Sequence, residues 1–564
     1  MVFKKVMTTA LAIALVGGTL IGCSSKNTDS ATSAPKDSGT AVTTAPAATA
    51  TQELKELKMN YRADPPALDV SIAESAASFT LLGAISEGLY RLDKDLKPTP
   101  GLAADMPAIS PDGLTYTIKL RDANWSDGTP VKAGDFVYSF RRTLDPATKA
   151  TYAFMVAWIK GGEAIMNAKT PEDVETAKKA LGATAPDDKT LIITLERPIA
   201  FFTSQLAFLN FYPQKEEFVK AQGEKSGADA DKVLGAGPFN LTKWNHDQTL
   251  VLEKNPKYWD AANVKLDKVT LNIVKDTATG LNLYETKAAD YADVKGDQIK
   301  DYKGKPDLKL KSELVIGYLN FQQTKVPAFK NAKVRQAMSM AVDRQGIADV
   351  VLVNGSVPAT GYVPNGTVDG NNQDFRSIAK DAEVAYDPAK AKTLLAEGLK
   401  DAGVTELPKL TVVGDDTETS KKLLEFLVSQ WKVNLGVVVD TEPMPHKNRL
   451  ERELKGDYTI VSTLWGADYN DPMTFLDMYL TGGSFNTQNW SNAKYDELVK
   501  SAQKNTDPAA RSKELVEAEK ILMDEAAVFP LYFRSSQFVV RPNVEGLILP
   551  SFGPDFELKW TSIK

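Results

Sequence analysis

The chain has 564 residues, 43% of them hydrophobic and 25% charged, which is enough for two or three domains with separate cores. Its formal charge of −6 lacks the basic excess that a nucleic-acid surface requires, so we expect no nucleic-acid partner. One cysteine and two histidines exclude an intrachain disulfide and leave little material for a metal cage or a Cys–His catalytic pair, so we expect no metal, no cofactor and no catalytic residue.

Residues 1–22 have the layout of an export signal. Lys4 and Lys5 precede an apolar run that is too short and too interrupted by glycine for a membrane span. The run ends in Leu20-Ile21-Gly22-Cys23, which resembles the cleavage box of bacterial lipoproteins. That resemblance implies removal of residues 1–22, a lipid on Cys23 and a position at the cell membrane, on its extracytoplasmic face. A plain signal peptide with an incidental cysteine is the alternative.

Residues 23–52 are predicted to be a flexible tether. Ser, Thr, Ala and Pro dominate this segment, which has almost no large apolar side chain and cannot bury enough surface to offset its ordering entropy. Such a tether would hold the folded remainder of the chain away from the membrane.

The first part of the folded remainder alternates strand and helix patterns. We expect strands over 114–120, 190–195, 249–253 and 269–274, and helices over 136–144 and 172–181. Residues 201–212 are rich in phenylalanine and leucine, which suits either the wall of a ligand cleft or a core. Core is the favoured interpretation, because aromatic side chains supply much of any protein interior.

The last third of the chain has the pattern of an α/β domain. An extended crossing over 314–321 precedes a helix over 334–342. A strand over 410–413, an amphipathic helix over 423–431 and a strand over 437–439 form a βαβ unit, which implies parallel strands. Residues 529–533 are predicted to return to the first domain.

A short loop, Gly466-Ala467-Asp468-Tyr469-Asn470, joins a predicted strand over 457–465 to a helix. Asp471 is expected to cap that helix and Pro472 to be its first residue. Loops at the carboxyl ends of strands are where α/β folds place ligand sites. Asp468, flanked by Trp465 and Tyr469, would suit a cationic group such as an amine. The alternative is that Asp468 only shapes the turn.

Several further motifs occur in the order found in a known family. They are Ile85-Ser86-Glu87-Gly88-Leu89-Tyr90, Pro100-Gly101-Leu102-Ala103, Trp125-Ser126-Asp127-Gly128-Thr129-Pro130-Val131, Asp135-Phe136-Val137-Tyr138-Ser139, Gly237-Pro238-Phe239, Asn255-Pro256-Lys257-Tyr258-Trp259 and Val334-Arg335-Gln336-Ala337. With the Asp468 loop, they resemble the peptide-binding family of ABC-importer substrate-binding proteins, the oligopeptide-binding lipoproteins in particular. The resemblance runs from about residue 55 to the carboxyl terminus.

The resemblance implies an α/β, periplasmic-binding-protein-like fold of two lobes joined by hinge strands, with an extra subdomain. The implied divisions are a discontinuous domain I (53–86, 211–313 and 533–564), domain II (87–210) and domain III (314–532), which carries the Asp468 loop. It also implies a monomer that captures oligopeptides and delivers them to the permease subunits of an ABC transporter.

The resemblance also implies the site. Asp468 would take the ligand's amino group, and strand edges on either side would bind its backbone, one at Glu74-Ser75-Ala76 and the other at Trp465-Gly466-Ala467. Tyr152 would lie beside the first ligand residue, and Asn486 would be a weaker candidate at the pocket wall. A lobe-surface aromatic is the alternative for Tyr152.

The sequence departs from the family pattern at two positions, because Ser462 replaces an arginine of some relatives and His446 a tryptophan. Peptide length and carboxyl-end anchoring therefore stay open. Related binders of dipeptides, nickel or other small ligands, and a receptor for peptide signals, are the alternatives within the family. A secreted hydrolase would be the rival from another class, but no G-x-S-x-G motif or nucleophile–base pair is recognisable.

Overall fold

The computed structural model describes residues 54–296, 298–371, 373–380 and 385–564. The predicted signal, the lipid site at Cys23 and the tether lie outside these residues. Within the described part of the chain, no helix is both long and apolar enough to cross a membrane.

One sheet of eleven strands runs through the body. Its strands are β1 (Glu56–Tyr61), β8 (Phe239–Asn245), β9 (Thr249–Lys254), β10 (Lys268–Ile273), β11 (Tyr291–Val294), β12 (Leu308–Phe321), β13 (Val357–Pro358), β14 (Leu410–Asp415), β15 (Val439–Met444), β16 (Ile460–Gly466) and β17 (Phe529–Val540). Their order is β15-β14-β16-β12-β17-β11-β1-β10-β9-β8, with β13 paired to β17. The two longest strands, β12 and β17, therefore lie in the middle of the sheet.

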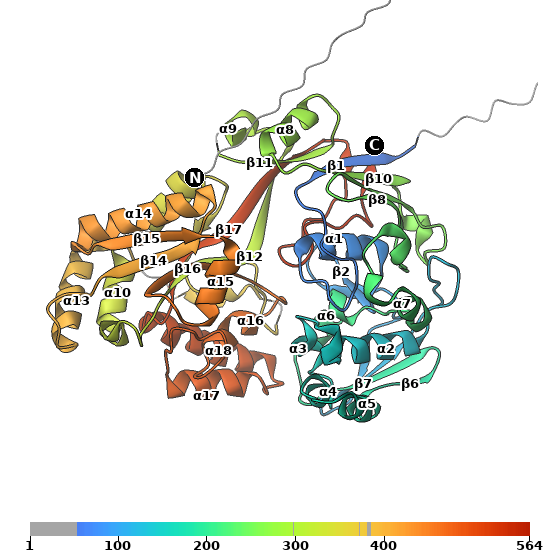
Figure 1. Ribbon diagram of the computed structural model, residues 1–564, viewed down its shortest axis with the longest axis horizontal. Coiled ribbons are helices and arrows are strands. Elements are labelled where there is room, and N and C mark those ends of the chain that lie inside the picture. The colour runs from blue at the N-terminus through green and yellow to red at the C-terminus, as the bar shows by residue number, and fades with distance from the viewer. Residues whose placement is uncertain (1–53, 297, 372, 381–384) are drawn as a thin grey trace, which may run out of the picture. The chain divides into compact units, whose positions relative to one another are not determined.

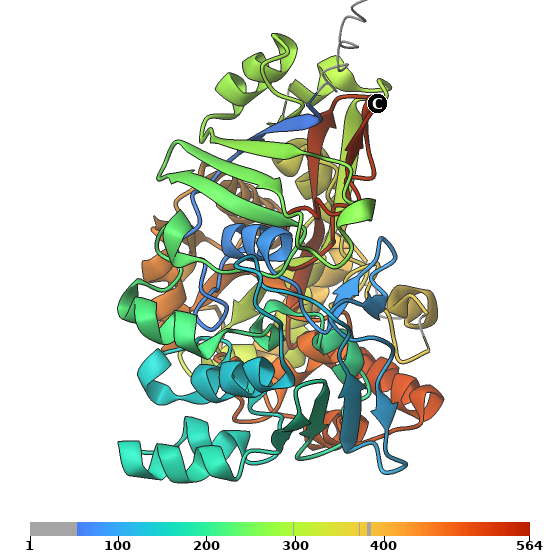
Figure 2. The ribbon, with the colours of Figure 1, turned by 90° about the vertical axis from the view of Figure 1, so that its right-hand side faces the viewer.

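Strands β12 and β17 run through the middle of this sheet. For description, we call residues 54–313 and 533–564 the first lobe and residues 314–532 the second lobe, following the predicted domain boundaries. Figure 1 shows β17 running between the two sets of strands, and Figure 2 shows it as a long red strand in side view. The first part of β12 pairs with the end of β17, its last part pairs with the start of β17, and the register shifts between Ser312 and Ile316. The predicted extended stretch over 314–321 is confirmed as part of β12, and residues 529–533 begin the long strand β17. The register irregularity lies close to the predicted lobe boundary at residue 314.

The second lobe contains the predicted βαβ unit. Strands β14 and β15 pair in parallel, and the helix between them, α14 (Glu418–Leu435), packs Leu424, Leu427 and Trp431 into the core. Strand β15 begins at Val439 and not at 437, because Gly436 ends α14 in the left-handed region with φ 74°. Figure 1 shows α14 alongside β15.

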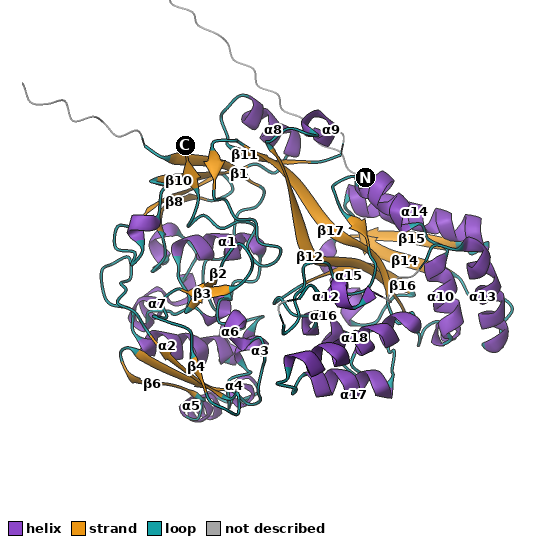
Figure 3. Cartoon of the chain, turned by 180° about the vertical axis from the view of Figure 1, so that it is seen from behind, coloured by secondary structure: helices purple, strands orange, loops and turns teal. Residues whose placement is uncertain are grey.

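The second lobe contains further helices. Those described include η6 (Pro327–Lys330), α10 (Ala332–Met340), α11 (Arg344–Gly346), η7 (Ile347–Leu352), α12 (Phe375–Ile378), α13 (Pro388–Asp401), α15 (His446–Leu454), α16 (Met473–Leu476), η9 (Asp477–Tyr479), α17 (Ala493–Ala502) and α18 (Pro508–Asp524). Helix α10 confirms the prediction over 334–342. Figure 3 shows α17 and α18 side by side below α16.

A separate four-stranded sheet, in the order β4-β5-β7-β6, lies in the first lobe. Its strands are β4 (Ala108–Ile109), β5 (Thr115–Lys119), β6 (Ala183–Asp187) and β7 (Thr190–Thr194). Helices of this lobe include α1 (Ala76–Ile85), α2 (Ala133–Leu144), α3 (Ala153–Val156), α4 (Gly162–Met166), α5 (Pro171–Lys179), α6 (Phe202–Gln205), α7 (Glu216–Gln222), α8 (Thr277–Glu285) and α9 (Gln298–Tyr302). Strands β5, β7, β9 and β10 and helices α2 and α5 confirm the predicted elements.

The aromatic run at 201–212 contributes to both core and cavity. Phe202 and Phe211 are fully buried in the core, as predicted. Phe201 and Phe208 are only partly buried and line cavities. Residues 54–564 form one compact unit, and the boundaries between domains I, II and III stay a prediction.

Candidate functional site

Strand β16 ends at a loop whose shape is fixed by backbone hydrogen bonds. The Ala467 N–H donates to Leu314 O of β12 (2.8 Å), and the Asp468 N–H donates to Thr474 Oγ1 (3.2 Å). The Trp465 indole donates to Thr474 O (2.9 Å). These bonds hold the loop without using the Asp468 carboxylate, which has no hydrogen-bond or ion-pair partner among the described residues. The turn-shaping alternative for Asp468 therefore loses its basis.

The helix after the loop begins one residue later than predicted. Pro472 occupies the cap position of α16, and Tyr479 and Leu480 lie beyond its end. Asp471 accepts from the Met473 N–H (2.9 Å) and forms a bidentate ion pair with Arg511 (2.7 and 2.8 Å). The helix is assigned from Met473, although Pro472 already has helical dihedral angles (φ −58°, ψ −23°). The expected capping bond of Asp471 is present, and the ion pair with Arg511 is an additional contact.

Two carboxylates share the space beside the loop. Asp468 and Asp477 both line a cavity of about 260 Å³ whose aromatic walls are Phe154, Trp158, Phe201, Trp465 and Phe485. Burial raises the pKa of Asp468 to about 7. Burial, and then repulsion from Asp468, raise the pKa of Asp477 to about 7, while Arg197 acts in the opposite direction. Among the described residues, these two buried carboxylates have only one nearby positive charge, that of Arg197, and this favours a cationic ligand.

Tyr152 lies close to Asp468. Burial raises the pKa of its hydroxyl, and the negative charges of Asp468 and Glu74 raise it further. The ring packs edge-on against Phe79 and Phe208, with centroids 5.9 and 5.6 Å apart. The structure therefore brings together Tyr152, Glu74 and Asp468, which come from three separate stretches of the sequence.

One edge of strand β16 has no strand partner beyond Val461 among the described residues. It pairs with β12 along its whole length, but its pairing with β14 stops at Val461. Since Ala467 bonds Leu314 across the antiparallel pair, alternation directs the backbone groups of Ser462, Leu464 and Gly466 away from β12. An extended ligand can add to this edge as a strand.

The facing segment at Glu74-Ser75-Ala76 is shorter as an extended edge than predicted. Ser75 is extended (φ −112°, ψ 149°), and its hydroxyl accepts from the Ser78 N–H to cap α1. Ala76 is the first residue of α1, so the expected third residue of the edge is helical. Thr151 donates to the Glu74 carboxylate (2.7 Å), which ties this segment to Tyr152.

Asn486 is committed to the protein's own backbone. It is buried, its amide donates to the carbonyls of Tyr479, Leu480 and Trp490, and its oxygen accepts from the Trp490 N–H. Its neighbours Ser484 and Phe485 line the 260 Å³ cavity. The expected contact of Asn486 with the pocket is therefore not seen in this structure, because the side chain holds the wall from behind.

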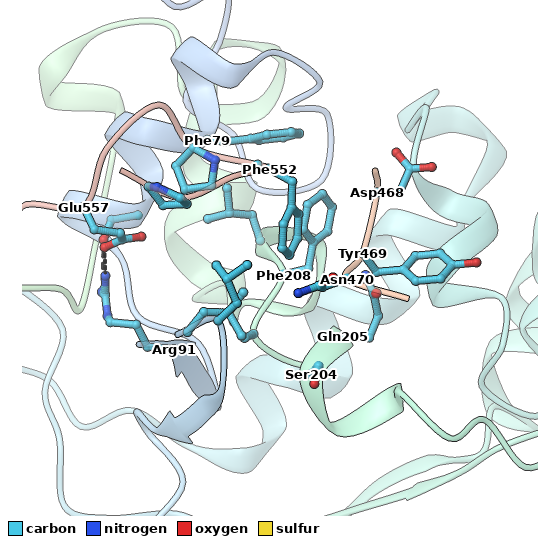
Figure 4. A pocket seen from close by; sticks show the side chains of 18 of the residues that line it. Phe79, Arg91, Ser204, Gln205, Phe208, Asp468, Tyr469, Asn470, Phe552 and Glu557 are labelled. Carbon is cyan, nitrogen blue, oxygen red and sulfur yellow. Dashed lines mark hydrogen bonds and ion pairs between the residues drawn. The ribbon is translucent and has the colours of Figure 1, made fainter. Parts of the chain in front are cut away.

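Two further cavities adjoin the site. One of about 50 Å³ lies behind Asp468, and Figure 4 shows Phe79, Phe208 and Phe552 in its middle, with Arg91 and Glu557 paired at its far end. Another, of about 200 Å³, follows Ser462 to Leu464 and is lined by Asp415, Arg534 and the start of α14.

Sequence reasoning missed Asp477, Arg197 and the cavity next to α14. The position of the cavity could have been inferred from the sequence, because α14 follows the carboxyl end of a parallel strand, where α/β folds place ligand sites. His446, whose family position is a pocket tryptophan, bonds Asp415 (3.1 Å) at the edge of this region.

Comparisons with known proteins agree with this geometry. Residues 97–487 match the model of the bacterial extracellular solute-binding proteins, family 5, middle region. The chain is 33% identical to the dipeptide-binding protein DppE of Bacillus subtilis, over 90% of this chain and 91% of that protein. It is similar to the structure of Listeria monocytogenes OppA bound to peptide (TM-score 0.74, 36% identity, covering 91% and 100%). It is also similar to that of the pheromone receptor PrgZ (TM-score 0.75, 31% identity, covering 91% and 100%).

Proposed function

Because the chain belongs to the family 5 bacterial extracellular solute-binding proteins, we propose that it captures peptides outside the cytoplasm and delivers them to the permease of an ABC importer. Members of this family bind solutes and are not enzymes. The relatives' names and the peptide-bound structure support a peptide ligand.

The observation that carries the proposal is the partnerless carboxylate of Asp468 at the end of an open strand edge. All peptides share a backbone, and those with an unmodified amino end carry an ammonium group. The edge of β16 offers N–H and C=O groups to the backbone, and Asp468 offers a carboxylate to the ammonium group. Neither contact depends on the side chains of the ligand, so one site can accept peptides of many sequences.

Capture would involve movement of the lobes about β12 and β17. The register shift between Ser312 and Ile316 lies where β12 leaves one lobe and enters the other. A few residues at the ends of elements can absorb such a hinge motion. Closure would place Glu74 and Tyr152 over the ligand held on β16.

Surface anchoring is part of the same proposal. The lipoprotein-like box at residues 20–23 and the polar segment that follows support a monomer tethered to the membrane through lipid on Cys23. Incorporation of labelled palmitate into the full-length protein, and its loss in Cys23→Ala, would test this. Unchanged labelling in Cys23→Ala would contradict it.

A signalling role is the second candidate, supported by the similarity to the pheromone receptor PrgZ. A signal receptor would use the same site. Two measurements separate the roles: growth with peptides as the nitrogen source would indicate uptake, and a transcriptional response to peptides would indicate signalling.

Titration calorimetry of the body from residue 54, unfolded and refolded to remove bound ligand, tests the function. Unmodified peptides of two to eight residues should bind, and the N-acetylated versions should not. Asp468→Ala should weaken binding at least tenfold, since removing a desolvated charge partner costs about 2–5 kcal/mol. Asp301→Asn, an exposed carboxylate on α9, is the control. No heat from any peptide would overturn the proposal.

A further inference from the structure

We propose that the 260 Å³ cavity beside Asp468 receives the side chain of the ligand's first residue and that Asp477 selects a cationic side chain there, lysine or arginine. This inference rests on the proposed function, since it takes the ligand's amino group to be at Asp468. It adds a specificity residue that the general capture of peptides does not need.

The position of the cavity assigns it to the first residue. The amino group and the side chain of that residue leave the same carbon atom, and Asp468 itself forms part of the cavity wall. Asp468 also touches the smaller cavity next to Phe79 and Phe208, but at about 50 Å³ that space is a fifth as large. A long side chain therefore fits the cavity that contains Asp477.

The residues that line the cavity indicate a positive charge on the ligand side chain. The carboxylate of Asp477 has no hydrogen-bond or ion-pair partner within the described residues, and its environment is aromatic on several sides. Rings of Trp158, Phe201 and Trp465 can pack along the aliphatic stem of a lysine or arginine and attract its cation. With the ligand bound, two ligand cations would meet two carboxylates.

Arg197 is the group that opposes this selection. It lines the same cavity, and its guanidinium donates one long hydrogen bond, to Gln503 O (3.4 Å). Its charge lowers the pKa of Asp477, against the effects of burial and of Asp468. Asp471, the remaining acid near Asp477, is neutralised by its bidentate pair with Arg511. The unliganded cavity therefore holds one more acid than base when both carboxyls are ionised.

A matched series of tripeptides tests the inference. Lys-Ala-Ala and norleucine-Ala-Ala differ mainly in the terminal charge of the first side chain, and binding to the refolded protein is measured by calorimetry at pH 8. The lysine peptide should bind at least tenfold more tightly. Asp477→Asn should remove this difference, and Arg197→Gln should increase it, while Asp301→Asn should leave it unchanged.

The outcomes separate this inference from the proposed function. Equal or tighter binding of the norleucine peptide, lost on N-acetylation, would overturn the role of Asp477 and leave the peptide receptor intact. No binding of either peptide, or of any other unmodified peptide, would overturn the receptor itself. If Asp477→Asn does not fold, Arg197→Gln alone decides, since an unchanged preference in that variant contradicts a charge-selective cavity.

Discussion

Tyr469 lies flat on Phe201, with ring centroids 4.3 Å apart and an angle of 8° between the rings. Tyr469 follows Asp468 in the second lobe, whereas Phe201 and Trp158, which meets the same tyrosine edge-on, belong to the first. The residue next to Asp468, the proposed ligand carboxylate, is therefore also a contact between the lobes. In our proposal, ligand binding and closure of the lobes depend on the same short loop.

Replacing Tyr469 should weaken ligand binding through closure. Aromatic pairs contribute about 0.5–1.5 kcal/mol beyond their buried area, so Tyr469→Ala should lower peptide affinity about three- to tenfold, whereas Tyr469→Phe should bind normally. Small-angle scattering of liganded Tyr469→Ala should show a larger radius of gyration. An alanine variant with unchanged affinity and radius would show that the stacked rings do not contribute to closure.

Peptide affinity should fall as the pH falls below about 7. Burial raises the pKa of Asp468 to about 7, so the ligand's ammonium group must displace a proton at lower pH. Between pH 7 and 5 we expect a loss of roughly tenfold per pH unit, shared with the coupled Asp477. Calorimetry in buffers of different ionisation enthalpy should detect the released proton. In Asp468→Asn this dependence should be reduced to the part that belongs to Asp477.

The stability of the ligand-free protein should change with pH in the direction opposite to that of peptide affinity. The folded state holds protons on Asp468 and Asp477 up to about pH 7, whereas an unfolded aspartate loses its proton near pH 4. The folded state therefore binds more protons between these values, and this contribution to stability is lost as the pH rises from 4 through 7. Urea denaturation of wild type and of the Asp468→Asn, Asp477→Asn double variant would measure it. Identical pH slopes would contradict the prediction.

Arg511→Met should destabilise the protein by about 3–5 kcal/mol. It would leave Asp471 buried without its bidentate partner, and both side chains are almost completely buried. Arg62→Met, at an exposed pair with Asp555, is the matched control and should cost about 0–1 kcal/mol. Equal urea midpoints for the two variants would contradict this assignment.

Gly317→Ala should disturb the hinge strand β12. A Cβ at this position would come within 2.5 Å of the Tyr532 ring on β17, which real structures do not tolerate. The expected cost is about 1–3 kcal/mol. In a double-mutant cycle with Tyr532→Ala, a favourable coupling energy should appear, because the second change removes the clash. If the two changes in unfolding free energy are simply additive, the cost of Gly317→Ala does not come from contact with Tyr532.

Local patterns predicted most elements of the fold. The alternation at 410–413 and the helical spacing at 423–431 were sufficient to identify the βαβ unit, and Asp468 followed from its place after a strand. What they could not supply was the pairing of distant segments. The shared strands β12 and β17, and the approach of Phe201 to Tyr469, depend on tertiary contacts that no short window contains.

The contacts at the site that the sequence did not reveal have a similar cause. Asp471 accepts from the N–H at the start of α16, as predicted, but its ion pair with an arginine 40 residues later had no signal in the sequence. Asn486 is a polar residue of the kind expected at a pocket wall, but its side-chain amide donates to three backbone carbonyls. Asp477 showed no signal at all, because its importance comes from burial next to Asp468.

The unpaired edge of β16 also bears on aggregation. Exposed strand edges invite pairing with other chains and are a common origin of aggregation. Here the open stretch from Ser462 to Gly466 borders two cavities, and the one at Trp465 is also lined by Trp158 and Phe201 of the first lobe. We expect these walls to leave little room for a folded protein with its own layers of side chains. A single extended chain is thin enough to enter. We therefore expect the same walls to limit pairing of this edge with other copies of the chain and to exclude folded proteins as cargo.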